Sequence, residues 1–442
     1  MQSLSDHFGY GGLLKFILPS VVMMVFTSIY GVVDGLFVSN FVGKTAFAAI
    51  NLIMPLLIIL GAVGFMLGTG GSAVVAKTMG MREGELANRY FSCIIITTVA
   101  SGVVLSALGI AFAEPIARLL GAEGELLSDC VLYARVVLLA LPAFMLQNVF
   151  QAFFITAERP KLGLLFTVGA GVTNMVLDAL LVAVIPMGLL GAALATAISQ
   201  AVGGLLPIFY FLSRKNASAL RLCKTRFFGK MLLRASANGS SELLSNVSMS
   251  VVTMLYNNQL MKFAGENGIA AYGAIMYVAF IFASIFIGFS IGSSPTVSYH
   301  FGAGNTGELR SLRKKSLVIV GVGGVLMCLT AYLLSSPLSH LFVGYDAALC
   351  ALTEHGFRIF SLSFIFSGFN IFASGFFTAL NDGLRSAIIS FARTVIFQCG
   401  TVTVMPIFFE LEGVWWSVVA SDVLAFCVGL IFLIAMRKRY NY

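Results

Sequence analysis

The chain has 442 residues, of which 59% are hydrophobic and only 10% are charged, whereas about a quarter of the residues in a soluble domain are charged. This composition excludes a soluble globular protein and predicts an integral membrane protein, and the 45 glycines suit helices that pack closely through small residues. The formal net charge of +8 would suit a nucleic-acid binder, but the basic residues follow membrane topology, so no nucleic-acid partner is expected.

Apolar segments long enough to cross a bilayer recur along the whole chain. In the first half they are expected at residues 13–38, 47–77, 91–113, 128–157, 162–185 and 191–213. In the second half they are expected at residues 234–261, 269–300, 316–335, 353–380, 386–408 and 414–436. The sequence therefore predicts an all-α polytopic membrane protein with twelve transmembrane helices.

Positive charge gathers in alternate connections between these segments. The largest groups are the stretch 214–234 and the tail 437–439, whereas the other connections carry mainly acidic residues such as Glu123, Asp129 and Glu412. Basic loops remain on the cytoplasmic side of a membrane. We therefore expect a protein of the bacterial inner or plasma membrane with both termini in the cytoplasm.

The chain also repeats itself. A constant shift of 222 residues lays Gly80 on Gly302 and Phe154 on Phe376. Each half has six helices, so the halves are parallel repeats related by an axis along the membrane normal. Two such bundles around a central cleft suit an alternating-access transporter, with a static scaffold as the alternative. The predicted domains are a first lobe at 1–213, a basic linker at 214–233 and a second lobe at 234–442.

Polar side chains inside the apolar segments are candidates for function, because a charge costs about 2.5–3.5 kcal/mol or more in the middle of a bilayer. Asp34, Asn174, Asp178 and Thr196 fall at similar depths in the first half. Together they form an all-oxygen set that suits a hard cation such as Na⁺, and two nearby carboxylates equally suit a shared proton. The alternative is that Asn174 and Thr196 only bond Asp178 between helices. The shift of 222 finds no copy of this set in the second half.

The second half has its own polar candidates. Glu242 lies early in the seventh segment, where it suits a proton or a cationic substrate, or simply a solvated cavity mouth. Arg393 and Asp422 reach similar depths from opposite ends, and a structural ion pair is expected for them. Pro19 permits a kink in the first helix. Tyr30, Met54 and Tyr277 are candidates to line the cleft, where aromatic and Met side chains suit large organic cations.

Seven scattered Cys form no CxxC motif and no Cys/His cluster, so neither a metal site nor a redox motif is expected. The membrane acids have no His, Cys or Ser arranged as catalytic partners, which argues against a membrane-embedded enzyme. We expect no cofactor, small organic substrates, surrounding membrane lipid and a monomer.

Several motifs resemble the multidrug and toxic compound extrusion (MATE) family over nearly the whole chain. They are Pro19-Ser20, Asp34-Gly35, Val42-Gly43, Gly71-Ser72, Gly80 and Asn174-xxx-Asp178. The resemblance implies a cation site at Asp34, Asn174, Asp178 and Thr196, and export of drugs or metabolites by Na⁺ or H⁺ entry. Glu242 resembles the acid that many members carry in the seventh helix. The acid that some members carry in the tenth helix is missing.

The sequence thus predicts a secondary active antiporter that exports drugs or organic, often cationic, compounds in exchange for Na⁺ or H⁺. A flippase for a lipid-linked precursor, from the same superfamily, is the alternative. Such a protein would line its cleft with several basic residues for a pyrophosphate, and only Arg393 lies deep in the membrane.

Overall fold

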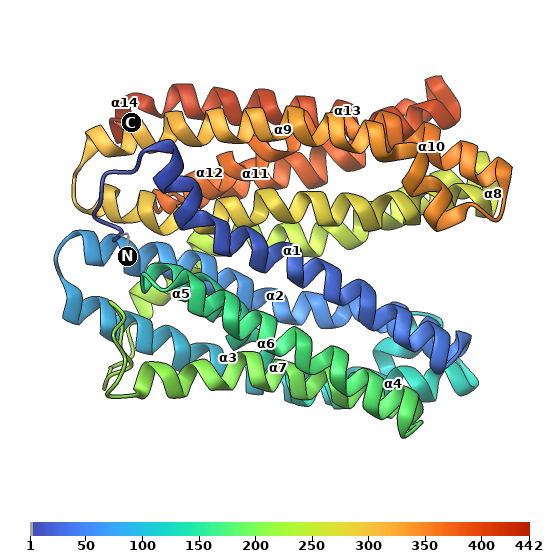
Figure 1. Ribbon diagram of the computed structural model, residues 1–442, viewed down its shortest axis with the longest axis horizontal. Helices are drawn as coiled ribbons and strands as arrows, with labels where there is room; N and C mark the ends of the chain where they lie inside the picture. Colours follow the sequence, from blue (N-terminus) through green and yellow to red (C-terminus); the bar gives the residue numbers. More distant parts are fainter. Residues whose placement is uncertain (1–2) are drawn as a thin grey trace.

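The computed structural model describes residues 3–442, apart from the side chains of residues 32, 35, 36, 39, 40 and 44. Figure 1 shows two bundles of helices side by side, one made of α1–α7 and the other of α8–α14, and residues 3–442 contain no strand. The first bundle comprises α1 (Tyr10–Phe41), α2 (Lys44–Gly80), α3 (Gly84–Leu119), α4 (Gly124–Leu139), α5 (Leu141–Thr156), α6 (Pro160–Asp178), the π-helical turn η1 (Ala179–Val184) and α7 (Gly188–Leu212). The second comprises α8 (Gly229–Gly302), α9 (Thr306–Val343), α10 (Ala347–Ser361), α11 (Phe364–Ala379), α12 (Gly383–Phe391), the π-helical turn η2 (Ala392–Gln398), α13 (Cys399–Ala435) and α14 (Arg437–Tyr440).

Two of these helices are hairpins. In α8 the backbone leaves helical geometry at Gly265 (φ 60°, ψ −149°), and the rings of Tyr256 and Tyr272 stack at 5.0 Å. Sixteen residues of straight helix would separate those rings by about 24 Å, so the chain must reverse between them. In α13 the break lies at Glu410 (φ 48°, ψ −129°), and Thr401 Oγ1 donates to the carbonyl of Ser417 at 3.0 Å.

The predicted all-helical architecture with twelve crossings is confirmed. Within residues 3–442, eight helices are long and apolar enough to span a membrane, and ten spans result when each bent pair is joined. The hairpins in α8 and α13 supply the other two crossings. Two predicted helices, 128–157 and 353–380, are in fact bent, by 54° between α4 and α5 and by 49° between α10 and α11. Pro142 begins α5, where a missing amide donor costs nothing.

The two bundles touch most closely at the end of the molecule that holds both termini (Figure 1), and α2 crosses α8 there. A Cβ on Gly80 would lie 2.0 Å from the Tyr299 carbonyl oxygen, and a Cβ on Gly302 would lie 2.1 Å from the Lys77 carbonyl oxygen. Such backbone contact between helices needs residues without side chains. We call this end the basic end, because the basic loops and tail lie there.

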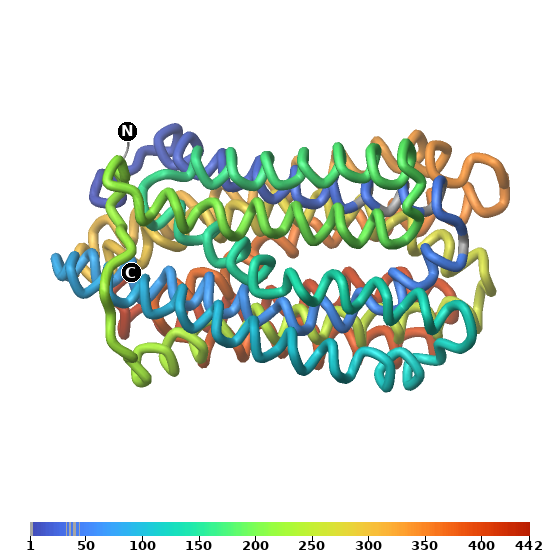
Figure 2. Tube along the Cα trace, turned by 90° about the horizontal axis from the view of Figure 1, so that it is seen from below, coloured from blue at the N-terminus to red at the C-terminus, as the bar shows by residue number. Residues whose placement is uncertain are grey.

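The N-terminal segment bridges both bundles at the basic end. The Leu4 amide and the Ser3 hydroxyl donate to Glu158 of the first bundle at 2.8 and 2.6 Å. His7 and the Phe8 amide bond to Glu308 of the second bundle. Figure 2 shows the linker, residues 213–228, running along the same end. The domain boundaries at residues 213 and 234 remain predictions.

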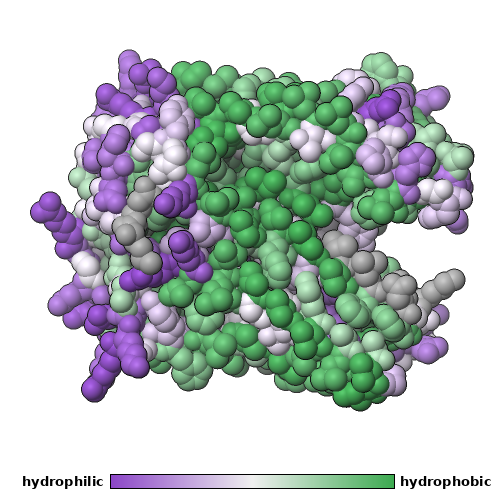
Figure 3. Space-filling view, viewed as in Figure 1, coloured by the Kyte–Doolittle hydropathy of each residue, from purple (hydrophilic) through white to green (hydrophobic). Residues whose placement is uncertain are grey.

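The surface between the two ends is apolar. Figure 3 shows hydrophilic residues gathered at both ends, a broad hydrophobic band between them, and a hollow between the bundles opposite the basic end. A belt of this kind matches the hydrocarbon layer of a bilayer. The protein is therefore an integral membrane protein that is closed at its basic end and open at the other.

Candidate functional site

The structure brings Asp34, Asn174, Asp178 and Thr196 together inside the first bundle. The Asp34 carboxylate on α1 lies beside the Asp178 carboxylate and the Asn174 side chain, both on α6. Thr196 on α7 lies beside the hydroxyl of Tyr133, which is itself close to both carboxylates. The four positions chosen from the sequence thus converge from three helices, α1, α6 and α7.

Several buried oxygen atoms of this group lack hydrogen-bond partners. Among the described residues, no partner is present for Asp34 Oδ1, Asn174 Oδ1, Thr196 Oγ1 or either carboxylate oxygen of Asp178. Asp178 is 0% exposed and Asn174 is 2% exposed. No Lys, Arg or His of the described chain forms an ion pair with Asp34 or Asp178. The protein itself therefore leaves these carboxylates uncompensated, at a cost that a bound cation would remove.

Helix geometry explains the position of Asp178. Asn174 and Asp178 are four residues apart on α6 and so project from one face. Asp178 is the last residue of α6 before the π-helical turn η1. In that turn the Ile185 amide donates to the Leu180 carbonyl, five residues earlier, at 2.8 Å. A π turn rotates the side chains that follow it and is frequent at functional sites.

Two polar residues near this group were missed from the sequence. Tyr133 Oη and Gln200 Oε1 are also buried and lack partners within the described part of the chain. Gln200 could have been found, because it follows Thr196 by one helical turn on the same face of α7. Tyr133 carried no signal, since an aromatic residue in an apolar helix usually belongs to the core.

Chemically, the group is a set of hard oxygen ligands. No cluster of three or more His, Cys, Asp or Glu occurs among residues 3–442 with described side chains. Two carboxylates, a carboxamide and a hydroxyl instead match the ligands of a hard cation, or the acceptors of a proton. The arrangement can therefore hold one small positive charge inside the membrane.

Glu242 and Pro19 lie apart from this group. Glu242 on α8 is partly buried, and its side chain has neither an ion pair nor a hydrogen bond among the described residues; only its backbone carbonyl is engaged, by Asn246 Nδ2 at 2.8 Å. The helix α1 continues through Pro19 without interruption. Directly after Pro19, Ser20 and Val21 pack against Gly288 of α8.

The three residues predicted for the cleft do not share one wall. Tyr277 lines a cavity of about 400 Å³ between α1 and α8, together with Met276 and Phe280. Tyr30 lies beside Asp34 and Gln147 in the first bundle. Met54 packs against the apolar core of that bundle. Only Tyr277 therefore contacts a cavity large enough for an organic molecule.

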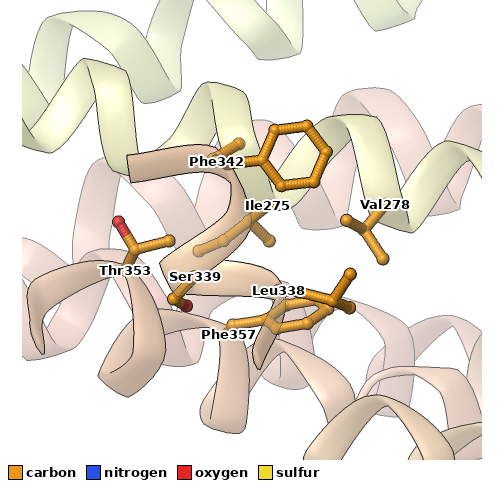
Figure 4. A pocket seen from close by; sticks show the side chains of 8 residues that line it. Ile275, Val278, Leu338, Ser339, Phe342, Thr353 and Phe357 are labelled. Carbon is orange, nitrogen blue, oxygen red and sulfur yellow. The ribbon is translucent and has the colours of Figure 1, made fainter. Parts of the chain in front are cut away.

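A second void within the second bundle is too small for a substrate. Figure 4 shows it between α8, α9 and α10, enclosed mainly by apolar side chains such as Ile275, Leu338 and Phe357. Its volume of about 10 Å³ leaves room for no more than about one water molecule.

The expected ion pair between Arg393 and Asp422 is present. Arg393 Nε donates to Asp422 Oδ1 at 3.1 Å, and Asn370 Nδ2 donates to the same oxygen at 3.2 Å. Arg393 is thus engaged within the second bundle. It does not stand as an unpaired basic residue.

Comparison with known proteins supports one family. The MatE family model matches residues 19–180 and 243–400, two stretches displaced by about the 222 residues of the internal repeat. The multidrug export protein MepA of Staphylococcus saprophyticus is 24% identical over 433 residues, covering 97% of this chain and 94% of MepA. MepA of Staphylococcus haemolyticus is 25% identical over 440 residues with the same coverage. An outward-facing structure of a multidrug resistance MATE family transporter of the MOP superfamily has a TM-score of 0.92 at 22% identity, covering 98% of this chain and 97% of that one. The chain therefore belongs to the MatE family of membrane transporters.

Proposed function

We propose that this transporter is a secondary active antiporter, which exports organic, often cationic, compounds in exchange for Na⁺ or H⁺. One observation carries the proposal: two neighbouring buried carboxylates, Asp34 and Asp178, have no counter-charge among the described residues. A fixed partner would have made the pair structural. A carboxylate pair without a counter-charge from the protein suits a site that binds the coupling cation. The name of the MepA relatives, multidrug export protein, supports organic substrates.

In the proposed cycle, an entering cation binds Asp34 and Asp178 and is also ligated by Asn174 and Thr196. Neutralising Asp34 alters the packing of α1, which carries Asp34 and also lines the cavity with Thr27, Ser28 and Gly31. Cation and substrate then favour different packings of one helix. A ligand shifts such an equilibrium only through its different affinity for the two states, which is how the two fluxes become coupled.

The basic end is assigned to the cytoplasm by the positive-inside rule, with both termini there. The closed glycine contacts between α2 and α8 then block the cytoplasmic side. The cavity between α1 and α8 opens toward the outside of the inner or plasma membrane. In the proposed cycle, cations approach Asp34 and Asp178 from this outer side.

The cavity suits a drug-sized compound. Its volume of about 400 Å³ lies in the usual range for small-molecule sites, roughly 300–1,000 Å³. Tyr277 and Phe280 are 47% and 50% exposed, and their rings offer cation–π contact, while Met276 offers an adaptable apolar surface. We assign the protein no cofactor and no nucleic-acid partner, and we propose that a monomer is the working unit.

A flippase for a lipid-linked pyrophosphate is the weaker alternative. It needs several cationic side chains free to bind phosphate in the cleft. The deep basic residue Arg393 is engaged by Asp422, and none of the described residues that line the cavity between α1 and α8 is basic.

Purified protein in proteoliposomes tests the proposal when Na⁺ and pH gradients are imposed separately. One of the two gradients alone should drive accumulation of a fluorescent organic cation, and collapsing that gradient with the matching ionophore should stop it. Accumulation that needs neither gradient would refute antiport.

A further inference from the structure

We infer that the second bundle contains its own buried cation site on Asp422 and Asn370, which the Arg393 guanidinium permanently occupies. The inference rests on the proposed function of Asp34 and Asp178. It adds that only one of the two bundles exchanges a cation with solvent. The observations that carry it are the internal repeat, the hydrogen bonds around Asp422, and the lack of hydrogen bonds at the matching positions of the first bundle.

The internal repeat relates polar positions of the second bundle to polar positions of the first. The shift of 222 residues lays Asn370 on Asn148 and Asp422 on Gln200. The same shift lays Tyr256 on Asp34. The two matches of the MatE model follow nearly the same displacement. Three polar positions on three different helices therefore recur in both bundles with changed side chains.

In the second bundle these side chains satisfy one another. Asp422 is 2% exposed and accepts hydrogen bonds from Arg393 Nε at 3.1 Å and Asn370 Nδ2 at 3.2 Å. Asn370 Nδ2 also lies 3.0 Å from the Asp422 carbonyl oxygen. The Tyr256 hydroxyl bonds to Ser417 Oγ at 2.7 Å. A buried carboxylate compensated in this way is stable within the membrane.

In the first bundle the matching atoms are unsatisfied. Asn148 Nδ2, Gln200 Oε1 and Asp34 Oδ1 are all buried and have no partner in the described part of the chain. Of these three residues Asp34 carries a charge, and it forms no ion pair among the described residues. The second bundle therefore supplies a compensating cation from its own chain, whereas the first bundle does not.

The position of the guanidinium explains why the two bundles differ. Arg393 lies in the π-helical turn η2, and the repeat places it on Gly171 of α6. A Cβ on Gly171 would lie 2.4 Å from the Phe26 ring of α1, so a long side chain there would have to displace that ring. The first bundle keeps α1 against this position, and the second bundle fills it with a cationic side chain.

This reading predicts a latent cation site. Removing the charge of Arg393 leaves the Asp422 carboxylate together with Asn370 Oδ1, which is buried and has no partner among the described residues. These are hard oxygen ligands, so the vacated place should take a small monovalent cation such as Na⁺. In the natural chain the guanidinium keeps that cation out.

Thermal unfolding of purified protein tests this in a background without the first site, Asp34→Asn/Asp178→Asn. Melting is compared in NaCl and in choline chloride at equal ionic strength. Adding Arg393→Gln should give a Tm about 2 °C or more higher in NaCl than in choline chloride. The matched control adds Arg393→Gln together with Asp422→Asn and should show no such difference. A folded Arg393→Gln protein without the Na⁺ response, or an equal response in the control, would overturn the inference.

If the Arg393→Gln variant does not fold, the number of cations transported per substrate tests the inference instead. The Arg393→Gln/Asp422→Asn variant of the otherwise natural chain keeps the pocket neutral and should transport with the same number of cations per substrate as the natural protein. A changed number would overturn the inference. Failure of the proposed function would look different, because the natural chain itself would then show no cation-driven transport.

Discussion

At the level of single residues, Asp178 has unfavourable surroundings for a charged group. It is 0% exposed, and both of its carboxylate oxygens lack partners among the described residues. Asp422 is nearly as buried but has Arg393 and Asn370. Two buried carboxylates in one protein thus differ in whether the chain supplies the compensating charge, and that difference separates a site from a structural pair.

The Asp178→Asn substitution removes the charge and keeps the size of the side chain. We expect cation-driven transport to fall to the level of empty liposomes, while the amount of folded protein and its Tm stay equal or rise, because an uncompensated buried charge is gone. Glu412→Gln is the control, since Glu412 is 53% exposed and pairs with His355 at 2.6 Å. It should transport normally. Full cation-driven transport by Asp178→Asn would remove this residue from the coupling site.

The sequence was sufficient to find the acids of the proposed site but not all of their polar neighbours. Asp34 and Asp178 stand out because charged residues are rare in apolar segments, and the Arg393–Asp422 pair followed from matching depths. Tyr133 was not predictable, because its hydroxyl only becomes significant when α4 is placed beside α7. Its orphaned oxygen is a property of packing between helices that are distant in sequence.

At the level of helices, close backbone contact at α2 and α8 sets which end is closed. Gly80 and Gly302 let the two helix backbones meet directly. A Cβ added to either glycine would lie about 2 Å from the facing carbonyl oxygen, which is too close for any side chain. Since Gly80 lies on the first bundle and Tyr299 on the second, this contact must break when the basic end opens. In the proposed alternating-access cycle, the glycines therefore stabilise the state that is closed at the basic end.

Gly80→Ala should destabilise the closed basic end by about 1–3 kcal/mol, as overpacking does. Single cysteines placed beneath the crossing should react faster with a thiol reagent added from the basic side. Gly84→Ala is the control, because nothing lies within 4 Å of a Cβ there. Equal reactivity of the two variants would show that the crossing does not act as a gate.

The helices themselves followed from apolar length, but their internal breaks did not. Hydrophobic runs place each crossing, and the hairpins at Gly265 and Glu410 fall where runs were expected to end. The bend between α10 and α11 and the π turns η1 and η2 change the course of the backbone locally, without a change in the apolar composition. Such local changes in the backbone therefore cannot be predicted from the hydropathy of the sequence.

At the level of the whole molecule, α1 connects the site, the cavity and the closed end. Asp34 lies in the first-bundle site, Thr27 and Gly31 line the cavity, and Ser20 and Val21 pack on Gly288 of the second bundle. Under the proposed mechanism, we therefore expect a change in charge at Asp34 to act along this one helix on the interface between the bundles. The N-terminal segment, which precedes this helix, forms hydrogen bonds to both bundles.

The two-bundle architecture was predictable because each half repeats the same pattern of six segments, whereas the open end was not. Both states of an alternating-access protein bury the same apolar segments, so composition and periodicity are identical in the two. Which end is closed depends on contacts such as Gly80 with Tyr299. Those contacts exist only between helices from different halves.

The most direct test of the central claim is substrate-driven cation movement in proteoliposomes without any imposed cation gradient. A substrate gradient should drive Na⁺ or H⁺ in the opposite direction, at a constant number of cations per substrate, and Asp34→Asn and Asp178→Asn should both abolish the cation flux. Substrate movement without a counter-flux of either cation, or a counter-flux that persists in both variants, would contradict the assignment of Asp34 and Asp178 as the coupling site.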